Sequence, residues 1–318
     1  MRYNTYEVVD TLDYSANTTK SIDLPRSGYI THIDCLLEAS VSAGASASAA
    51  EDGITRLIKA ARIKASGAKN FFDVTDGRQW EYIARLFYQN QLHKDSLPEA
   101  SSSGTVRMQL PIHLGTNPFD LFDRTVVIPA RELSNLVLEV EWGAASDLGT
   151  DYTVSSATMY VTVHEVALEP GESVEDVWPE GLVSPRMEPN QLTLKQASNL
   201  GFEHDAPVGD TLFWAFLMAT TSAGARSNDV IDEVGVKLPK LRETPYRERW
   251  EQFVYKARRQ YSLSSDLTGV GMLPLSWISG EPYGLDLTAA MVGDVKLGFT
   301  VPSGGANGIL HIVYMCIG

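Results

Sequence analysis

Alternating apolar and polar residues predict β-strands at both ends of the chain. One face of segment 136–142 is apolar and the other carries two glutamates, the apolar side chains being Leu136, Leu138, Val140 and Trp142. The same alternation occurs in 33–37 and 295–301. Segments 212–218 and 309–317 are apolar on both faces, which is typical of strands that lie between two layers. The pattern therefore predicts a mostly β protein.

One series of dissimilar segments occurs twice in the same order, which indicates an internal duplication. Each copy has a strand, a small-residue loop that ends near an acidic residue, further strand-like segments, a helix, a Ser-rich loop and two closing strands. The first copy also predicts a hairpin turn at Ser66-Gly67. The small-residue loops are ASVSAGASASAA and ATTSAGARSN, and the paired landmarks are Asp52 and Asp229, Trp80 and Trp250, Pro111 and Pro274.

The two predicted helices begin at different capping signals. In the first copy, Asp76 is the expected N-cap, and Gln79 three residues later completes a capping box. In the second copy, Thr244 is the expected cap and Pro245 the first helical residue, where a missing N–H costs nothing. These signals predict helices that continue as WEYIARLFYQ and WEQFVYKARRQY.

A proline-rich stretch separates the two copies. Its prolines cannot pair in a central strand or continue a helix, and they stand at positions 170, 179, 185 and 189. About eight short strands and one helix in each half fit a jelly roll better than an immunoglobulin sandwich. We therefore expect an all-β protein with two tandem eight-stranded jelly-roll barrels, each with a short inserted helix. The expected boundaries are an N-terminal arm at 1–20, a first barrel at 21–168, a linker at 169–192 and a second barrel at 193–318.

Composition narrows the possible functions. The chain has 318 residues, 44% of them hydrophobic, and a net charge of -14, so its average surface repels nucleic acid. Cys35 and Cys316 lie in apolar strand-like runs, which favours buried free thiols over a disulfide. Neither a signal peptide nor an apolar run long enough to span a bilayer is recognised. We expect synthesis in the cytosol.

Motifs of catalysis and metal binding are not recognised, so the sequence predicts no enzyme activity, no catalytic residue, no metal site and no cofactor. The six histidines are scattered singly. His164-Glu165 begins like a zinc-protease motif but lacks the second histidine. Gly269-Val270-Gly271 is interpreted as a turn, and the acidic cluster of Glu172, Glu175 and Asp176 as a solvated linker face.

A basic segment is the one candidate binding element. It surrounds an apolar stripe of Trp250, Phe253, Val254 and Ala257 with the cations Arg247, Arg249, Lys256, Arg258 and Arg259. It is either a contact for acidic neighbours, genome or lipid, or a helix packed on its own barrel with a solvated charged side. Trp80 and Trp250 are similarly either stacking platforms or anchors of their helices.

The repeated order of segments, the proline-rich linker, the helices WEYIARLFYQ and WEQFVYKARRQY, and the short N-terminal arm resemble one known family over nearly the whole chain. This family is the double jelly-roll major capsid proteins of the adenovirus-related lineage of tailless icosahedral viruses, particularly bacterial and archaeal viruses with an internal membrane.

The resemblance implies a virion protein without an active site, which forms homotrimers and then a capsid lattice. Three copies of two barrels give a pseudo-hexagonal capsomer. Such a trimer closes through a heterologous interface, in which two different faces of each subunit meet. Minor capsid or penton proteins are implied partners, and an internal membrane is an implied contact of the N-terminal arm or the basic helix. Sequence-specific binding of nucleic acid is not expected.

Two other functions remain open, because a fold does not fix a function. Tandem jelly rolls also occur in a secreted amidase family that removes N-linked glycans, and such an enzyme carries an acidic cluster near a Trp. A carbohydrate-binding protein is the third alternative, for which we expect an exposed row of aromatic side chains.

Overall fold

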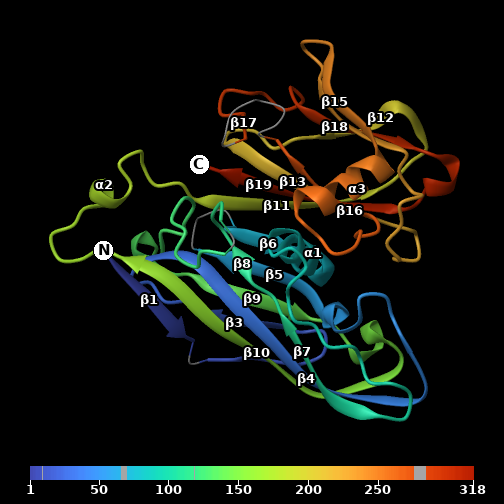
Figure 1. Ribbon diagram of the computed structural model, residues 1–318, viewed down its shortest axis with the longest axis horizontal. Coiled ribbons are helices and arrows are strands. Elements are labelled where there is room, and N and C mark those ends of the chain that lie inside the picture. Colours follow the sequence, from blue (N-terminus) through green and yellow to red (C-terminus); the bar gives the residue numbers. More distant parts are fainter. Residues whose placement is uncertain (9, 66–69, 118, 276–283) are drawn as a thin grey trace. The chain divides into compact units, whose positions relative to one another are not determined.

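The computed structural model describes residues 1–318 except 9, 66–69, 118 and 276–283. The chain divides into two units, Met1–Arg186 and Met187–Gly318. Each unit contains two antiparallel sheets. The prediction of an all-β fold with two tandem jelly-roll barrels is confirmed (Figure 1).

The first barrel is built from a sheet with the strand order β1-β10-β4-β7, to which β2 and β8 attach, and a sheet with the order β3-β9-β5-β6. Its strands are β1 (Arg2–Glu7), β2 (Leu12–Asp13), β3 (Thr19–Asp23), β4 (Tyr29–Ala49), β5 (Ile58–Lys64), β6 (Phe72–Val74), β7 (Ser103–Gln109), β8 (Ile112–His113), β9 (Val137–Trp142) and β10 (Gly149–Ala167). Its helices are α1 (Gly77–Phe87) and α2 (Val174–Val177), with 3-10 turns at Gly53–Leu57, Ala130–Glu132 and Ala145–Leu148.

The second barrel repeats this arrangement, with sheets in the order β11-β19-β13-β16, plus β17, and β12-β18-β14-β15. Its strands are β11 (Pro185–Thr193), β12 (Ala197–Asp205), β13 (Thr211–Thr220), β14 (Glu233–Leu238), β15 (Glu243–Arg249), β16 (Val270–Pro274), β17 (Leu285–Asp286), β18 (Lys296–Val301) and β19 (Ile309–Ile317). Helix α3 (Trp250–Gln260) follows β15, and a 3-10 turn lies at Ser303–Gly305.

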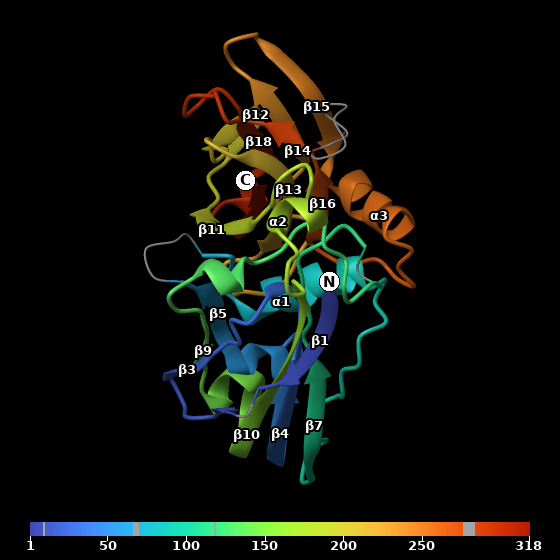
Figure 2. The ribbon, with the colours of Figure 1, turned by 90° about the vertical axis from the view of Figure 1, so that its left-hand side faces the viewer.

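The two barrels correspond strand by strand. The first strand pairs with the last in both barrels, β1 with β10 and β11 with β19. The last strand then pairs with β4 or β13, and that strand pairs with the one that follows the helix, β7 or β16. In each barrel the helix follows the last strand of one sheet and precedes a strand of the other sheet. Figure 2 shows α3 beside β16 in the second barrel. The duplicated order of segments in the sequence is therefore a duplicated topology.

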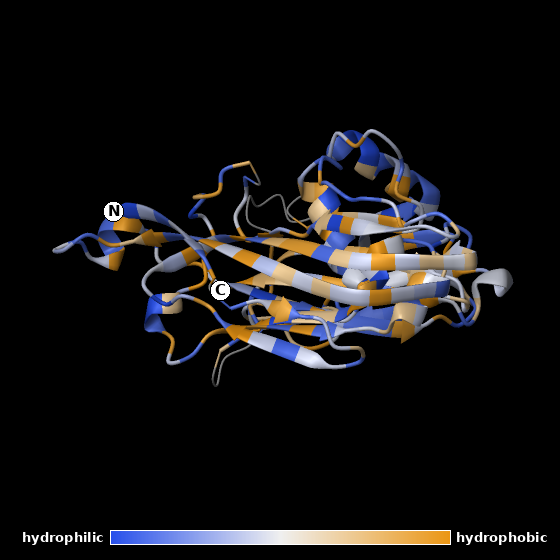
Figure 3. Ribbon diagram, turned by 90° about the horizontal axis from the view of Figure 1, so that it is seen from below, coloured by the Kyte–Doolittle hydropathy of each residue, from blue (hydrophilic) through white to orange (hydrophobic). Residues whose placement is uncertain are grey.

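The core of each barrel comes from the alternating positions. In β9, Leu138, Val140 and Trp142 are fully buried, and the hydropathy of the strands alternates along their length (Figure 3). In the second barrel, the apolar face of β18 joins strands β13 and β19 and helix α3 in one cluster. Both cysteines are buried and neither forms a disulfide, as expected.

Two local predictions differ from the structure in the first barrel. The small-residue segment ASVSAGASASAA is mostly the far end of β4, because β10 and β7 supply partners for its backbone. Asp76 caps α1 as predicted and accepts the N–H of Arg78 at 2.9 Å, but Gln79 accepts the N–H of Thr75 and does not complete a capping box. The predicted turn at Ser66-Gly67 lies outside the described residues.

The predicted start of the second helix is wrong. Thr244 and Pro245 belong to strand β15, and α3 begins at Trp250. Strand β15 lies at the edge of its sheet, where a residue without an N–H is tolerated. Arg247 and Arg249 therefore belong to a strand, with Arg249 at the N-cap position of α3.

The predicted boundaries also differ from the division of the chain. Residues 2–7 pair with β10 as a strand of the first barrel, whereas the sequence suggested an arm at 1–20. Strand β11 begins at Pro185, inside the stretch 169–192 that was interpreted as a linker. It is an edge strand of the second barrel, so its prolines do not interrupt the ladder of a central strand.

Candidate functional site

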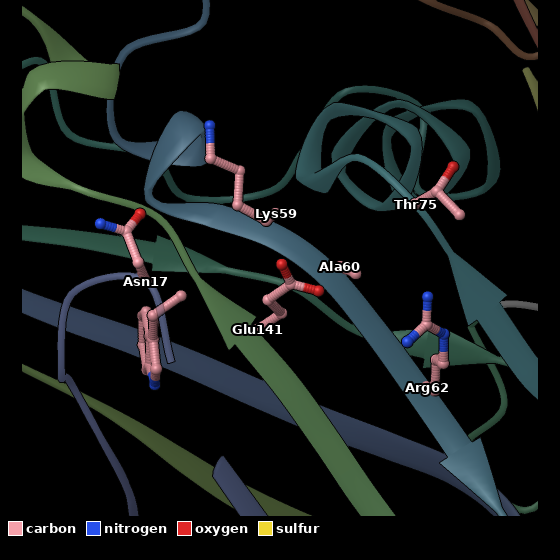
Figure 4. Close-up of a pocket in the computed structure, with 7 residues that line it drawn as sticks. Asn17, Lys59, Ala60, Arg62, Thr75 and Glu141 are labelled. Carbon is pink, nitrogen blue, oxygen red and sulfur yellow. The ribbon is translucent and has the colours of Figure 1, made fainter. Parts of the chain in front are cut away.

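A polar pocket lies on the sheet β3-β9-β5-β6 of the first barrel (Figure 4). It has a volume of about 360 Å³ and is lined by Asn17, Lys59, Ala60, Arg62, Thr75, Glu141 and Trp142. Both of its cations have carboxylate partners, since Lys59 pairs with Asp147 at 2.7 Å and Arg62 with Asp73 at 3.0 Å. Glu141 is the single acid among the lining residues. The pocket therefore lacks the facing pair of carboxylates that glycoside hydrolysis requires.

Three histidines that are far apart in the sequence form a row across three strands of the other sheet in the same barrel. His32 of β4 lies opposite His164 of β10 on one side and His113 of β8 on the other. The ring centroids are 5.6 Å apart for His32 and His164, and 6.1 Å apart for His32 and His113. We call these residues the histidine row. Sequence reasoning missed it, because only the strand register brings the three positions together.

Asp34 links two members of the row. Its carboxylate lies 3.1 Å from Nε2 of His32 and 3.2 Å from Nε2 of His164. Burial opposes ionisation of Asp34, but the hydrogen bonds with the two histidines outweigh it and hold the pKa of this carboxyl well below its usual range. Asp34 therefore places one negative charge beside two members of the row.

Two uncharged hydroxyl groups also lie beside the histidine row. Thr5 Oγ1 lies 3.1 Å from Nδ1 of His164, and the Tyr88 hydroxyl lies 3.2 Å from Nδ1 of His32. Burial and the Asp34 charge raise the pKa of Tyr88, so this hydroxyl stays protonated. Burial, together with His32, lowers the pKa of His113 to about 4. The site thus holds His113 as a neutral imidazole at neutral pH.

Residues 119–125 lie against the histidine row. The ring of Phe122 is 5.7 Å from that of His164, and Thr31 Oγ1 donates to the carbonyl oxygen of Leu121 at 2.6 Å. Asp123 organises this segment by accepting the backbone N–H groups of Thr116 at 2.7 Å and Asn117 at 2.6 Å. These contacts keep the three imidazoles between 1% and 7% exposed.

The basic segment of the second barrel packs on its own barrel. The four side chains of the apolar stripe are buried in the core. Among the described residues, ion pairs join Arg247 to Glu233 at 2.7 Å, Lys256 to Glu248 at 2.8 Å and Arg258 to Asp266 at 3.8 Å. The other two cations, Arg249 and Arg259, lie on strand β15 and helix α3.

Both candidate stacking tryptophans are buried. Trp80 and Trp250 are 0% exposed, which excludes stacking on a ligand from solution. Trp80 anchors α1 because its Nε1 donates to the carbonyl oxygen of Pro111 at 3.1 Å. Trp250 packs against Phe253 with ring centroids 5.3 Å apart.

The other positions singled out in the sequence take part in strands, helix caps or turns. His164-Glu165 lies on strand β10, and Glu165 accepts hydrogen bonds from Ser27 at 2.7 Å and Asn4 at 3.1 Å. Asp176 accepts the N–H of Ser173 at the start of α2. Gly269 has a φ of 70°, which suits a turn, while Gly271 lies in β16 directly under the ring of Phe253.

The described part of the chain offers neither a cluster of metal ligands nor a helix suited to cross a membrane. Outside residues 9, 66–69, 118 and 276–283, no group of three or more His, Cys, Asp or Glu side chains is arranged to hold a metal ion. In the same residues, no helix has the length and apolar character needed to cross a membrane.

Comparisons with known proteins show which solved structures share this fold. The sequence matches no protein-family profile and no curated protein. The structure is similar to the MCP of STIV, the Sulfolobus turreted icosahedral virus, with a TM-score of 0.83 and 16% identity, covering 100% of this chain and 97% of that chain. It is also similar to the PBCV-1 virus capsid, with a TM-score of 0.64, 10% identity and coverage of 99% and 93%.

A third similar structure comes from a bacteriophage. The major capsid protein P2 of bacteriophage PM2 has a TM-score of 0.56 and 15% identity, and the match covers 100% of this chain and 98% of that chain. These three neighbours are capsid proteins and not enzymes. The chain therefore has the double jelly-roll fold of viral major capsid proteins, and the resemblance recognised in the sequence is confirmed at the level of the fold.

Proposed function

We propose that this chain is the major capsid protein of a tailless icosahedral virus and resides in the virion. The observation that carries the proposal is the match of the entire chain, both barrels included, to nearly the entire length of viral capsid proteins. A shared fold alone is compatible with other functions. The proposal is supported further by the polar pocket, which has a single acid, and by two buried tryptophans where a sugar-binding protein needs exposed ones.

The proposed assembly is a homotrimer that tiles a capsid lattice. Three chains, each with two barrels of the same topology, supply six similar blocks around a three-fold axis. A single polypeptide then fills a site of nearly hexagonal symmetry. The minor capsid or penton proteins expected from the resemblance are proposed as further partners, which close the positions that a hexagonal tile cannot fill.

The N-terminal arm and the basic helix α3, which were suggested for contact with an internal membrane, differ in how much of their surface is exposed. Residues 2–7 are a strand of the first barrel, so this part of the expected arm is held in a sheet. Helix α3 buries its apolar side but leaves Tyr255 49% exposed next to the exposed Arg258 and Arg259. If the virion has an internal membrane, we propose that this outer side of α3 binds lipid headgroups without inserting into the bilayer.

Light scattering on the purified protein tests the proposal. We expect a stable particle with three times the chain mass of 34.9 kDa at all concentrations down to the micromolar range, because obligate interfaces bury several thousand Å². A chain that stays monomeric at high concentration contradicts a capsid function. Release of glycans from a glycoprotein substrate by that monomer, measured by mass spectrometry, indicates the amidase alternative instead.

A further inference from the structure

The histidine row has three side chains that can each bind a proton, but a single carboxylate forms hydrogen bonds with it. Three imidazoles lie side by side, and the nearest carboxylate that bonds to them is Asp34. This single charge is enough to neutralise one positive charge in the row. A second or third proton places like charges about 6 Å apart in a buried site, and burial and like charge both oppose it.

The charged and titratable groups around the row do not compensate for a second or third positive charge in it. Asp34 comes from β4, and Asp123 from the segment above the row favours a charged His113 only as a minor influence. Tyr88, which follows α1, stays protonated. Strand β1 contributes Thr5, with Glu7 two residues further on the same strand face. Surplus protons are therefore accommodated only if the row gains access to water.

We propose that the histidine row is an acid-operated clasp, which holds residues 119–125 against the first barrel at neutral pH and releases them when the row takes up more than one proton. The clasp consists of the Phe122 ring on His164, the Leu121 carbonyl on Thr31, and the ring of Phe119, 6.0 Å from that of Tyr88. Release exposes the Phe122 ring and enlarges the surface to which Phe119, already 57% exposed, belongs.

The pH range follows from the protonation states on the two sides of the equilibrium. A histidine in the released state titrates near its ordinary pKa of about 6.5, while the clasped His113 has a pKa of about 4. The released state therefore binds more protons between these values, and clasping weakens as the pH falls from about 6.5 to 4. Below this range both states are protonated and no further weakening follows. His113 alone shifts the equilibrium by about a hundredfold.

Hydrogen exchange, followed by mass spectrometry from pH 7.5 to pH 4 and corrected for the intrinsic effect of pH, tests the clasp. We expect exchange in residues 119–125 to increase by about a hundredfold across this range, while β13 in the second barrel stays protected. His113→Phe fills the same site without a titrating group and is expected to reduce the increase to less than about tenfold. His93→Gln removes an exposed histidine that pairs with Asp95 and is the matched control.

The outcomes separate clearly. A wild-type chain with unchanged exchange from pH 7.5 to 4, or a His113→Phe variant with the full wild-type response, overturns the clasp. If His113→Phe does not fold, Asp34→Asn decides, because loss of the counterion moves release upward by about one pH unit. An unchanged release pH in Asp34→Asn contradicts the inference. The measurement uses the chain alone and does not depend on the proposed capsid function, which is tested by particle mass.

Discussion

The two barrels share one strand order, yet they hold their inserted helices by different interactions. Helix α1 lies in a polar network, in which the nearly buried Glu81 accepts hydrogen bonds from Lys94 at 2.8 Å and Arg85 at 2.7 Å. Both helices also bury apolar side chains, such as Leu86 of α1 and Phe253 of α3, but the ion pair between Lys256 of α3 and Glu248 is partly exposed. The common topology therefore does not dictate how the helix is attached, and the two attachments respond differently to mutation.

The largest expected effect is common to both helices. Trp80→Ala and Trp250→Ala each remove a fully buried indole, which we expect to lower the free energy of unfolding by about 3–5 kcal/mol. Urea denaturation followed by circular dichroism measures it. Leu241→Ala is the control, because Leu241 is 66% exposed. A loss below about 1 kcal/mol in either tryptophan variant contradicts the anchoring role of that side chain.

The next effect distinguishes the two attachments. Glu81→Ala leaves the Lys94 amine, on a side chain that is only 17% exposed, without its carboxylate, and we expect a loss of about 3 kcal/mol in unfolding free energy. Glu248→Ala removes the partner of Lys256, which is 33% exposed, so a loss below about 1 kcal/mol is expected. Equal losses in the two variants, measured by the same denaturation, refute the contrast between the buried polar network of α1 and the partly exposed ion pair of α3.

A smaller effect concerns the starts of the helices. The Asp76 side chain caps α1, whereas no side-chain hydrogen bond caps α3 at Arg249 in the described part of the chain. Asp76→Ala is expected to cost about 2 kcal/mol, because Arg78 also loses its ion pair. Arg249→Ala is the matched variant and should change stability by less than about 0.5 kcal/mol. A larger loss in Arg249→Ala than in Asp76→Ala contradicts the assigned caps.

The smallest expected effect concerns the reactivity of the two cysteine thiols, one in each barrel. Cys35 lies in β4 of the first barrel and Cys316 in β19 of the second, and both are buried. Burial raises the pKa of the Cys35 thiol, which further suppresses its reaction. We expect neither thiol to react with a disulfide reagent in the native state, and each to react only when its own barrel opens. Rapid reaction of either thiol under native conditions rules out this placement.

The sequence predicted those elements whose signal is local. The alternation in β9 and β18 and the Asp76 cap are visible within a few residues, and the duplicated order revealed two barrels of the same kind. The edge strand β15 was mistaken for the start of a helix because Pro245 suits both a first helical turn and an edge strand. The small-residue end of β4 was taken for a loop, since its strand partners are more than 50 residues away.

The histidine row was invisible for the same reason. His32 and His164 are 132 positions apart, and only the register of β4 with β10 brings them together. Local spacing finds metal or catalytic motifs that lie on one element, but it does not find a row built from one residue on each of several strands. The pocket was missed likewise, because its lining comes from two strands and two connections.

Electron microscopy of the purified protein in negative stain tests the proposed capsid function most directly. Class averages are predicted to show particles with three-fold symmetry and a nearly hexagonal outline, made of six similar blocks. Averages that show single chains with two barrels, in a preparation of full-length folded protein, contradict the proposal.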